Sequence, residues 1–165
     1  MDADISTGQK CSVSGRTTMN KKAYYLSTVT GIIDESKAIL TKLEETQGDI
    51  ATTLKEAEKN QDQEELKSTY AATGKKYLPV FESLFEDVVR LRPKIDSLVP
   101  YRKYRRSQQY LVESVDCLDK SVQMQKDAFK KMAEGDIEGA VKDLLEASPL
   151  TVQGSKAIER FSSSL

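Results

Sequence analysis

One short run of alternating basic and aromatic residues stands out as a group able to bind something charged. It follows Pro100 and consists of Tyr101, Arg102, Lys103, Tyr104, Arg105 and Arg106. Arginine and lysine pair with phosphate oxygens, while tyrosine rings stack on bases or lie at an anionic lipid interface. The run therefore predicts a patch for an anion or an acidic partner, made of Tyr101, Arg102, Lys103, Arg105 and Arg106.

The same run has a second interpretation, as an ordinary solvated helix start. Glu86, Asp87 and Asp96 lie on the preceding segment and are expected to pair with some of these cations. Cations at a helix N-terminus, however, oppose the helix dipole. That mismatch makes the run the strongest local indication of function in the chain.

Carboxylates are the other group with the right types and spacing for chemistry. Glu82 and Glu86 lie four residues apart, as do Asp116 and Lys120, with Asp119 nearby. Carboxylates facing each other from two helices could hold Mg²⁺ or Ca²⁺. Because 31% of the residues are charged, solvated faces with ion pairs explain the pattern more simply. We predict no metal and no cofactor.

Conventional catalysis is disfavoured by the residue types that are missing. The sequence has no histidine, so the commonest general base and the Ser-His-Asp arrangement are both missing. Neither of the common glycine-rich phosphate-binding motifs occurs. The net charge of −1 also argues against a general polyanion binder, whose domain would be markedly basic. We expect that the protein is not an enzyme.

The two cysteines suggest no chemistry of their own. Cys11 lies in a polar N-terminal segment and Cys117 in a strongly periodic one. Their spacing fits neither a disulfide framework nor a metal site. Cys117 is predicted to be a small, half-buried helix residue.

The elements that must position these groups are helices. Three long stretches carry apolar residues at alternating steps of three and four, which keeps one narrow face of a helix apolar. The clearest stripe consists of Tyr104, Leu111, Val115, Leu118, Val122, Phe129 and Met132. Gln108 and Gln125 are its polar positions, explained either by register or partner selection or by partial exposure. No segment alternates with period two, so no strand is predicted.

The first two long helices have recognisable boundaries. Asn20 is the expected N-cap of the first, which continues past a weak point at Gly48. Asp62 caps the second. Gly74, Pro79 and Pro93 lie inside the second stripe, which predicts kinks, with a loop between Gly74 and Pro79 as the alternative.

The third helix is expected to begin near Tyr101 and to close at Gly135. A short helix then starts at Asp136 and ends by Pro149, and a last helical piece is expected over 150–161. The segment 135–147 resembles the turn and second helix of a tetratricopeptide repeat, with matches at Gly135, Ala140, Leu144 and Ala147. The resemblance covers one hairpin without a second copy about 34 residues away, so no peptide-binding function is implied.

Together these patterns predict an all-α protein: an elongated antiparallel bundle of three long, kinked helices plus one or two short C-terminal ones. The expected organisation is a disordered arm over 1–19, a single helical domain over 20–161 and a frayed end over 162–165. No transmembrane run or signal peptide is recognised, so a cytoplasmic location is the default expectation. Location outside the cytoplasm after removal of a signal is the alternative.

The predicted function is a non-catalytic interaction or scaffold module that contacts a protein partner or a second copy of itself. One alternative is a binder of polyanions (nucleic acid) or of an anionic lipid surface through 101–106. The other is a tethered extracytoplasmic ligand-binding or sensor domain.

Overall fold

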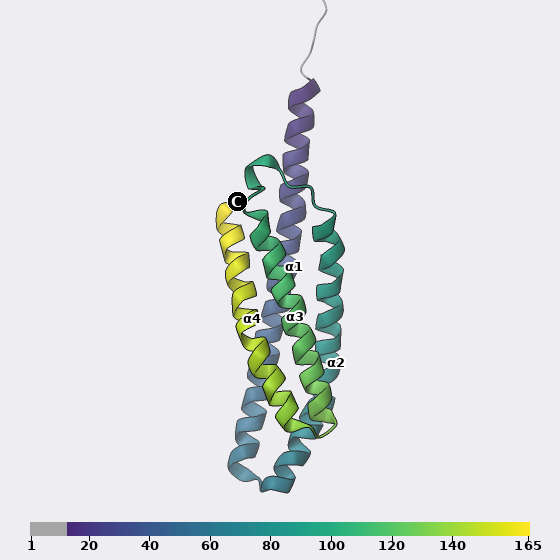
Figure 1. Cartoon of the computed structure of the whole chain (residues 1–165), viewed down its shortest axis with the longest axis vertical. Coiled ribbons are helices and arrows are strands. Elements are labelled where there is room, and N and C mark those ends of the chain that lie inside the picture. The colour runs from purple at the N-terminus through teal and green to yellow at the C-terminus, as the bar shows by residue number, and fades with distance from the viewer. Residues whose placement is uncertain (1–12) are drawn as a thin grey trace, which may run out of the picture.

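The computed structural model describes the backbone from Val13 and the side chains from Asn20 to the C-terminus. Four antiparallel helices make up the molecule, α1 (Val13–Asn60), α2 (Gln63–Asp96), α3 (Gln108–Ala133) and α4 (Ile137–Ser164) (Figure 1). A single turn of 3-10 helix, η1 (Arg102–Tyr104), precedes α3. No strand occurs between Val13 and Leu165. The predicted all-α antiparallel bundle is confirmed.

The helices do not pack equally. α3 packs closely against both α2 and α4, whereas α1 packs mainly against α2 and makes little contact with α4. The 48 residues of α1 correspond to about 70 Å at the helical rise, and its first turns extend beyond the other helices (Figure 1). One long side of the bundle, between α1 and α4, is therefore less tightly closed than the others.

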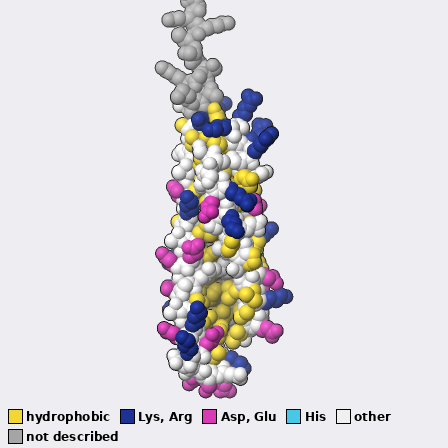
Figure 2. Space-filling view, turned by 90° about the vertical axis from the view of Figure 1, so that its left-hand side faces the viewer, with side chains coloured by type: hydrophobic (Ala, Val, Ile, Leu, Met, Phe, Trp, Pro, Cys, Tyr) yellow, Lys and Arg dark blue, Asp and Glu magenta, His cyan; other side chains and the backbone are white. Residues whose placement is uncertain are grey.

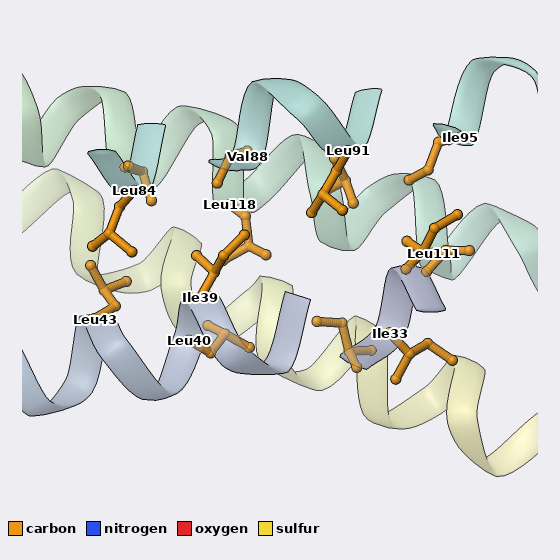
Figure 3. Packing of buried hydrophobic residues seen from close by; sticks show 14 of the residues in the cluster. Ile33, Ile39, Leu40, Leu43, Leu84, Val88, Leu91, Ile95, Leu111 and Leu118 are labelled. Atoms are coloured by element: carbon orange, nitrogen blue, oxygen red, sulfur yellow. The ribbon is translucent and has the colours of Figure 1, made fainter. Parts of the chain in front are cut away.

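The predicted apolar stripes form the core. Figure 3 shows Leu43 of α1, Leu84 and Val88 of α2 and Leu118 of α3 pointing into the space between the helices. The rings of Phe81 (α2) and Phe129 (α3) stack nearby, with centroids 4.4 Å apart. Full burial of each such side chain stabilises the fold by about 1.5–3 kcal/mol, so the stripes account for the packing of the helices against one another.

A buried polar group interrupts the core at one level. Gln125 is buried on α3; its Oε1 accepts from Nε2 of Gln47 on α1 at 2.7 Å, and its Nε2 donates to Oγ of Ser121 at 3.0 Å. The Ser121 hydroxyl lies 2.6 Å from that of Thr151 on α4. Partial exposure is thus the wrong explanation for Gln125. A hydrogen-bonded layer linking three helices is instead suited to fixing their register.

Two tight turns close the end opposite the first turns of α1, here called the turn end. Oδ1 of Asp62 accepts from the amides of Glu64 and Glu65, and the Glu65 carboxylate accepts from the Asp62 amide in return. Between α3 and α4, Gly135 has φ 92°, and Asp136 caps α4 by accepting from the Gly139 amide at 2.9 Å. The roles predicted for Asp62 and Gly135 are confirmed, and Asp136, the predicted start of the next helix, is its N-cap.

The N-terminal boundary of the first helix differs from its prediction. α1 begins at Val13, so Asn20 lies inside the helix and is not its N-cap. The heptad stripe starts only at Tyr25, which is why the sequence pattern gave no sign of the earlier turns. Residues 1–12, the rest of the predicted arm, lie outside the described residues.

The C-terminal part of the chain also differs, because it forms one helix of 28 residues that continues to Ser164. A short helix was expected to end by Pro149, with a separate helical piece over 150–161 that contains Gly154. Pro149 is exposed, where water can satisfy the carbonyl that its ring leaves unpaired. Gly154 is buried against α3, and a Cβ there would lie 3.2 Å from Cβ of Cys117 and 3.3 Å from the Ser114 carbonyl oxygen. Close helix packing, rather than a break, explains this glycine.

Candidate functional site at the basic end of the bundle

The predicted basic patch lies in the connection between α2 and α3, residues 97–107, at the end of the bundle opposite the turn end (Figure 1). Tyr101 is extended (φ −67°, ψ 137°), and its carbonyl accepts from the Tyr104 amide at 2.8 Å to form the single turn η1. α3 then begins at Gln108, so the start predicted near Tyr101 is wrong. We call this connection together with residues 20–28 of α1 the basic end.

The later start of α3 removes the electrostatic mismatch that the sequence suggested. All four cations of the patch precede the first residue of α3, so none lies in its first turn. The connection is held by Tyr104, whose buried ring stacks on that of Tyr25 with centroids 5.7 Å apart. Gln108 adds a second tie, since its Oε1 accepts from the Tyr25 hydroxyl at 2.9 Å and its Nε2 donates to the Leu98 carbonyl at 3.4 Å.

The charged side chains of the patch point to solvent and stay without acidic partners. Arg102, Lys103, Arg105 and Arg106 are all exposed, and within the described residues no carboxylate lies within 4.0 Å of any of them. The Nζ of Lys103 instead lies 5.2 Å from the centre of the Tyr104 ring. Among the described residues, the charges of Arg102, Arg105 and Arg106 therefore take part in no ion pair.

The acidic residues expected to neutralise the patch do not do so. Glu86 and Asp87 both pair with Arg90, one helical turn further along α2, at 4.0 and 3.5 Å. Asp96 forms no ion pair with the patch in the part of the chain that the structure describes. The prediction that these three carboxylates pair with the cations of the patch is wrong. The interpretation of the patch as a merely neutralised surface therefore loses its main support.

A pocket of about 750 Å³ opens beside the patch, between α1 and the connection. Residues of α1, the end of α2 and the connection line it: Asn20, Lys21, Tyr24, Tyr25, Thr28, Lys94, Ser97, Leu98, Val99, Pro100, Tyr101 and Arg102. Tyr101 and Arg102 thus belong both to the predicted patch and to the pocket. Sequence reasoning missed the pocket because α1 and the connection lie far apart along the chain, although Tyr24 and Tyr101 fall outside the core stripes.

The walls of this pocket are uncharged and its rim is positive. Burial and the neighbouring Tyr104 raise the pKa of Tyr25 to about 12, so the ring stays neutral at physiological pH. Lys94 pairs with Glu35 at 2.5 Å. Lys21 and Arg102 have no carboxylate within 4.0 Å among the described residues. Two unpaired cations therefore remain beside an apolar, aromatic wall.

The carboxylates considered as a metal site serve a different purpose. Asp116 and Asp119 of α3 both pair with Arg92 of α2, the latter at 3.7 Å. The hydrogen bond to Asp116 raises the pKa of Arg92. No cluster of three metal-ligating side chains occurs among the described residues. These carboxylates therefore act in an ion-pair group that joins α2 to α3.

Cys117 offers no reactive site in this structure. It is a buried free thiol, and burial together with Glu113 raises its pKa, so little of it ionises near neutral pH. Cys11 lies outside the described residues.

Comparisons with protein-family models, with curated proteins and with solved structures gave no match for this chain. From Val13 to Leu165, no helix combines the length and the apolar character needed to cross a bilayer.

Proposed function

We propose that this protein is a non-catalytic interaction module whose basic end docks on an anionic phospholipid surface. The observation that carries the proposal is the set of four exposed cations without acidic partners, Arg102, Lys103, Arg105 and Arg106. Figure 2 agrees with this placement, since lysine and arginine gather near the upper end of the face shown, while aspartate and glutamate lie at its lower tip. Each Lys or Arg near an anionic membrane contributes about 1 kcal/mol to binding.

Exposed apolar side chains favour a lipid surface over nucleic acid. Val99 is 82% exposed in the connection, and Tyr24 is 75% exposed on α1. An aliphatic side chain next to basic and aromatic ones is suited to the boundary between headgroups and acyl chains. The phosphate backbone of a nucleic acid would pair with the cations but would make no apolar contact with Val99.

The test is co-sedimentation with vesicles of phosphatidylcholine alone or mixed with phosphatidylserine. We expect binding only to the mixed vesicles, weakening as salt shortens the Debye length from about 8 Å at physiological ionic strength to about 3 Å at 1 M. Changing Arg102, Lys103, Arg105 and Arg106 to Ser should lower the partition coefficient by about 100-fold or more, given about 1 kcal/mol per cation.

A matched variant distinguishes the effect of where the cations lie from the effect of the net charge on vesicle binding. Changing the exposed Lys37, Lys55, Lys67 and Lys142 to Ser removes the same charge elsewhere on the bundle, and it should leave vesicle binding nearly unchanged. Equal loss in both variants, or binding to single-stranded DNA with none to vesicles, would overturn the proposal.

A second function, self-association, is favoured by an apolar face on α4. Val141, Leu145 and Val152 are exposed, and steps of four and seven residues place them on one side of the helix. Figure 2 faces the side along which α4 runs and shows a hollowed apolar area in its lower half. We infer that this face contacts a second copy of the chain, as expected for an exposed apolar stripe on a bundle.

Solution mass by light scattering tests this second proposal. We expect a dimer that becomes monomeric when Val141, Leu145 and Val152 are changed to Ser. The control changes Lys142, Glu146 and Lys156, which are also exposed on α4, to Ser and should remain dimeric. A wild-type protein that stays monomeric at high concentration would rule this function out.

A further inference from the structure

The pocket at the basic end has the size and lining of a small-molecule site. Its volume of about 750 Å³ lies within the roughly 300–1,000 Å³ typical of ligand pockets. Leu98, Val99 and Pro100 supply an aliphatic wall, while Tyr24, Tyr25 and Tyr101 supply aromatic rings. A ligand that fills this space must therefore be mostly apolar.

Tyr25, the most buried tyrosine of the pocket wall, already makes contacts within the fold. Its hydroxyl donates to Oε1 of Gln108 at 2.9 Å, and its ring stacks on Tyr104. Tyr25 is therefore held in place before any ligand arrives, which lowers the entropy lost on binding. A ligand in the pocket would therefore contact the ring of Tyr25 and not its hydroxyl.

The charges around this pocket differ from those around two other cavities of the molecule. No acidic residue is among its lining residues. The cavity between α1 and α2 is lined by Glu35 and Asp87, and the one near the α3–α4 turn by Asp127, Glu134 and Asp143. Lys21 and Arg102 are thus the only unpaired charges on the rim among the described residues, so the rim selects for an anion.

The geometry points to a binding site for a monomeric long-chain fatty acid. Its aliphatic chain would lie along Leu98, Val99 and the ring of Tyr24, and its carboxylate would lie at the rim beside Lys21 and Arg102. Arg102 can form two parallel hydrogen bonds to a carboxylate. This site goes beyond the proposed membrane docking, because a free fatty acid can be bound in the absence of any bilayer.

Isothermal titration calorimetry with saturated fatty acids, kept below their micelle-forming concentrations, tests the site. While the chain still fits, each added CH₂ should raise affinity about fourfold, which is the conversion of about 0.8 kcal/mol per buried CH₂. The fatty alcohol of the same length should bind about tenfold more weakly, because it lacks the charge that the rim pairs with. Acetate should show no measurable binding.

Variants locate the binding. Thr28 lines the pocket, so Thr28→Phe should fill it and abolish fatty acid binding. If that variant does not fold, Val99→Asp replaces it, because an exposed side chain tolerates the change, and it should lower affinity at least tenfold. The matched control is Val89→Asp on α2, where the valine is also exposed and does not line the pocket, and it should bind like the wild type.

A pair of variants separates this site from membrane docking. Arg105 and Arg106 do not line the pocket, so changing both to Ser should weaken vesicle binding and leave fatty acid affinity unchanged. Thr28→Phe should do the reverse. Absence of calorimetric binding by the wild-type protein, or binding that Thr28→Phe and Val99→Asp leave unchanged, would overturn the fatty acid site without bearing on vesicle binding.

Discussion

The two ends of this bundle use their charged residues in opposite ways. At the turn end, Asp62 and Asp136 accept hydrogen bonds from the free amides at the starts of α2 and α4. At the basic end, Arg102, Arg105 and Arg106 neither cap a helix nor form an ion pair within the described residues. One end stabilises the fold with its charges, and the other leaves them free to bind.

The backbone follows the same division. The turn end uses short, capped turns, one with a left-handed glycine at Gly135. The basic end uses residues 97–107, a longer connection with one turn of 3-10 helix and no side-chain cap at Tyr101 or Ser107. Long, uncapped connections on a rigid scaffold are common places for binding residues. Substitutions at the turn end should therefore change stability, and those at the basic end should change binding.

The largest effect is expected from Gly74→Ala, in the half of α2 nearer the turn end. A Cβ at this buried position would clash with the backbone amide of Ala133 and would lie 2.9 Å from its Cα. Since backbone cannot move aside cheaply, we expect a loss of about 3 kcal/mol or more in the free energy of unfolding. Urea denaturation followed by circular dichroism measures it.

Gly48→Ala is the matched control for that change. Gly48 lies in the interior of α1, and a Cβ at this position would meet no atom within 4 Å. Alanine should therefore raise the free energy of unfolding by about 0.5–1 kcal/mol. If Gly74→Ala were also stabilising, the close approach of α2 and α3 would be contradicted.

The next effect concerns the basic end, where Arg105→Ser with Arg106→Ser should weaken binding to phosphatidylserine-containing vesicles by about 2 kcal/mol. The free energy of unfolding should stay within about 0.5 kcal/mol of the wild-type value, because both side chains are exposed and unpaired. Vesicle sedimentation and urea denaturation of the same preparation test both statements. A large loss of stability would mean that these arginines belong to the fold after all.

Features that depend on local sequence or on periodic burial could be predicted. The apolar stripes decided the all-α antiparallel fold, because one narrow apolar face per helix can be buried in few ways. The caps at Asp62 and Asp136 were predictable because a cap involves only the next turn of chain. The basic patch was found for the same reason, since its residues are consecutive.

Features that depend on packing between distant residues could not be predicted. Gly74 suggested a kink or a loop, yet it lies inside a helix at a point where another helix approaches closely. Glu86 and Asp87 pair with Arg90 and not with the patch, which sequence spacing does not reveal. The pocket depends on α1 passing beside the connection. The local signals that could have indicated it were Tyr24 and Tyr101, which fall outside the core stripes, and Val99, an aliphatic residue in a loop.

A smaller effect on stability should appear at alkaline pH, where Tyr25 of α1 contacts the connection. Because the pKa of Tyr25 is raised from 10.0 to about 12 in the folded protein, the unfolded chain releases this proton first as pH rises. The stabilising contribution is thus complete below pH 10 and is lost as pH rises toward 12. We expect the stability advantage of the wild type over Tyr25→Phe to shrink by about 1–2 kcal/mol over that interval, as measured by urea denaturation. An advantage independent of pH would show that Tyr25 ionises as freely in the folded as in the unfolded chain.

The smallest effect returns to the turn end, where Asp62→Ala should lower the free energy of unfolding by about 1 kcal/mol. The substitution removes the acceptor for the amides of Glu64 and Glu65 at 3.0 and 2.9 Å. Asp49→Ala is the control, because Asp49 is exposed in the interior of α1 and should change stability by less than about 0.5 kcal/mol. Vesicle binding should be the same in both variants, since each removes one negative charge far from the basic end. If Asp62→Ala alone altered vesicle binding at unchanged stability, the separation of a stabilising end from a binding end would be wrong.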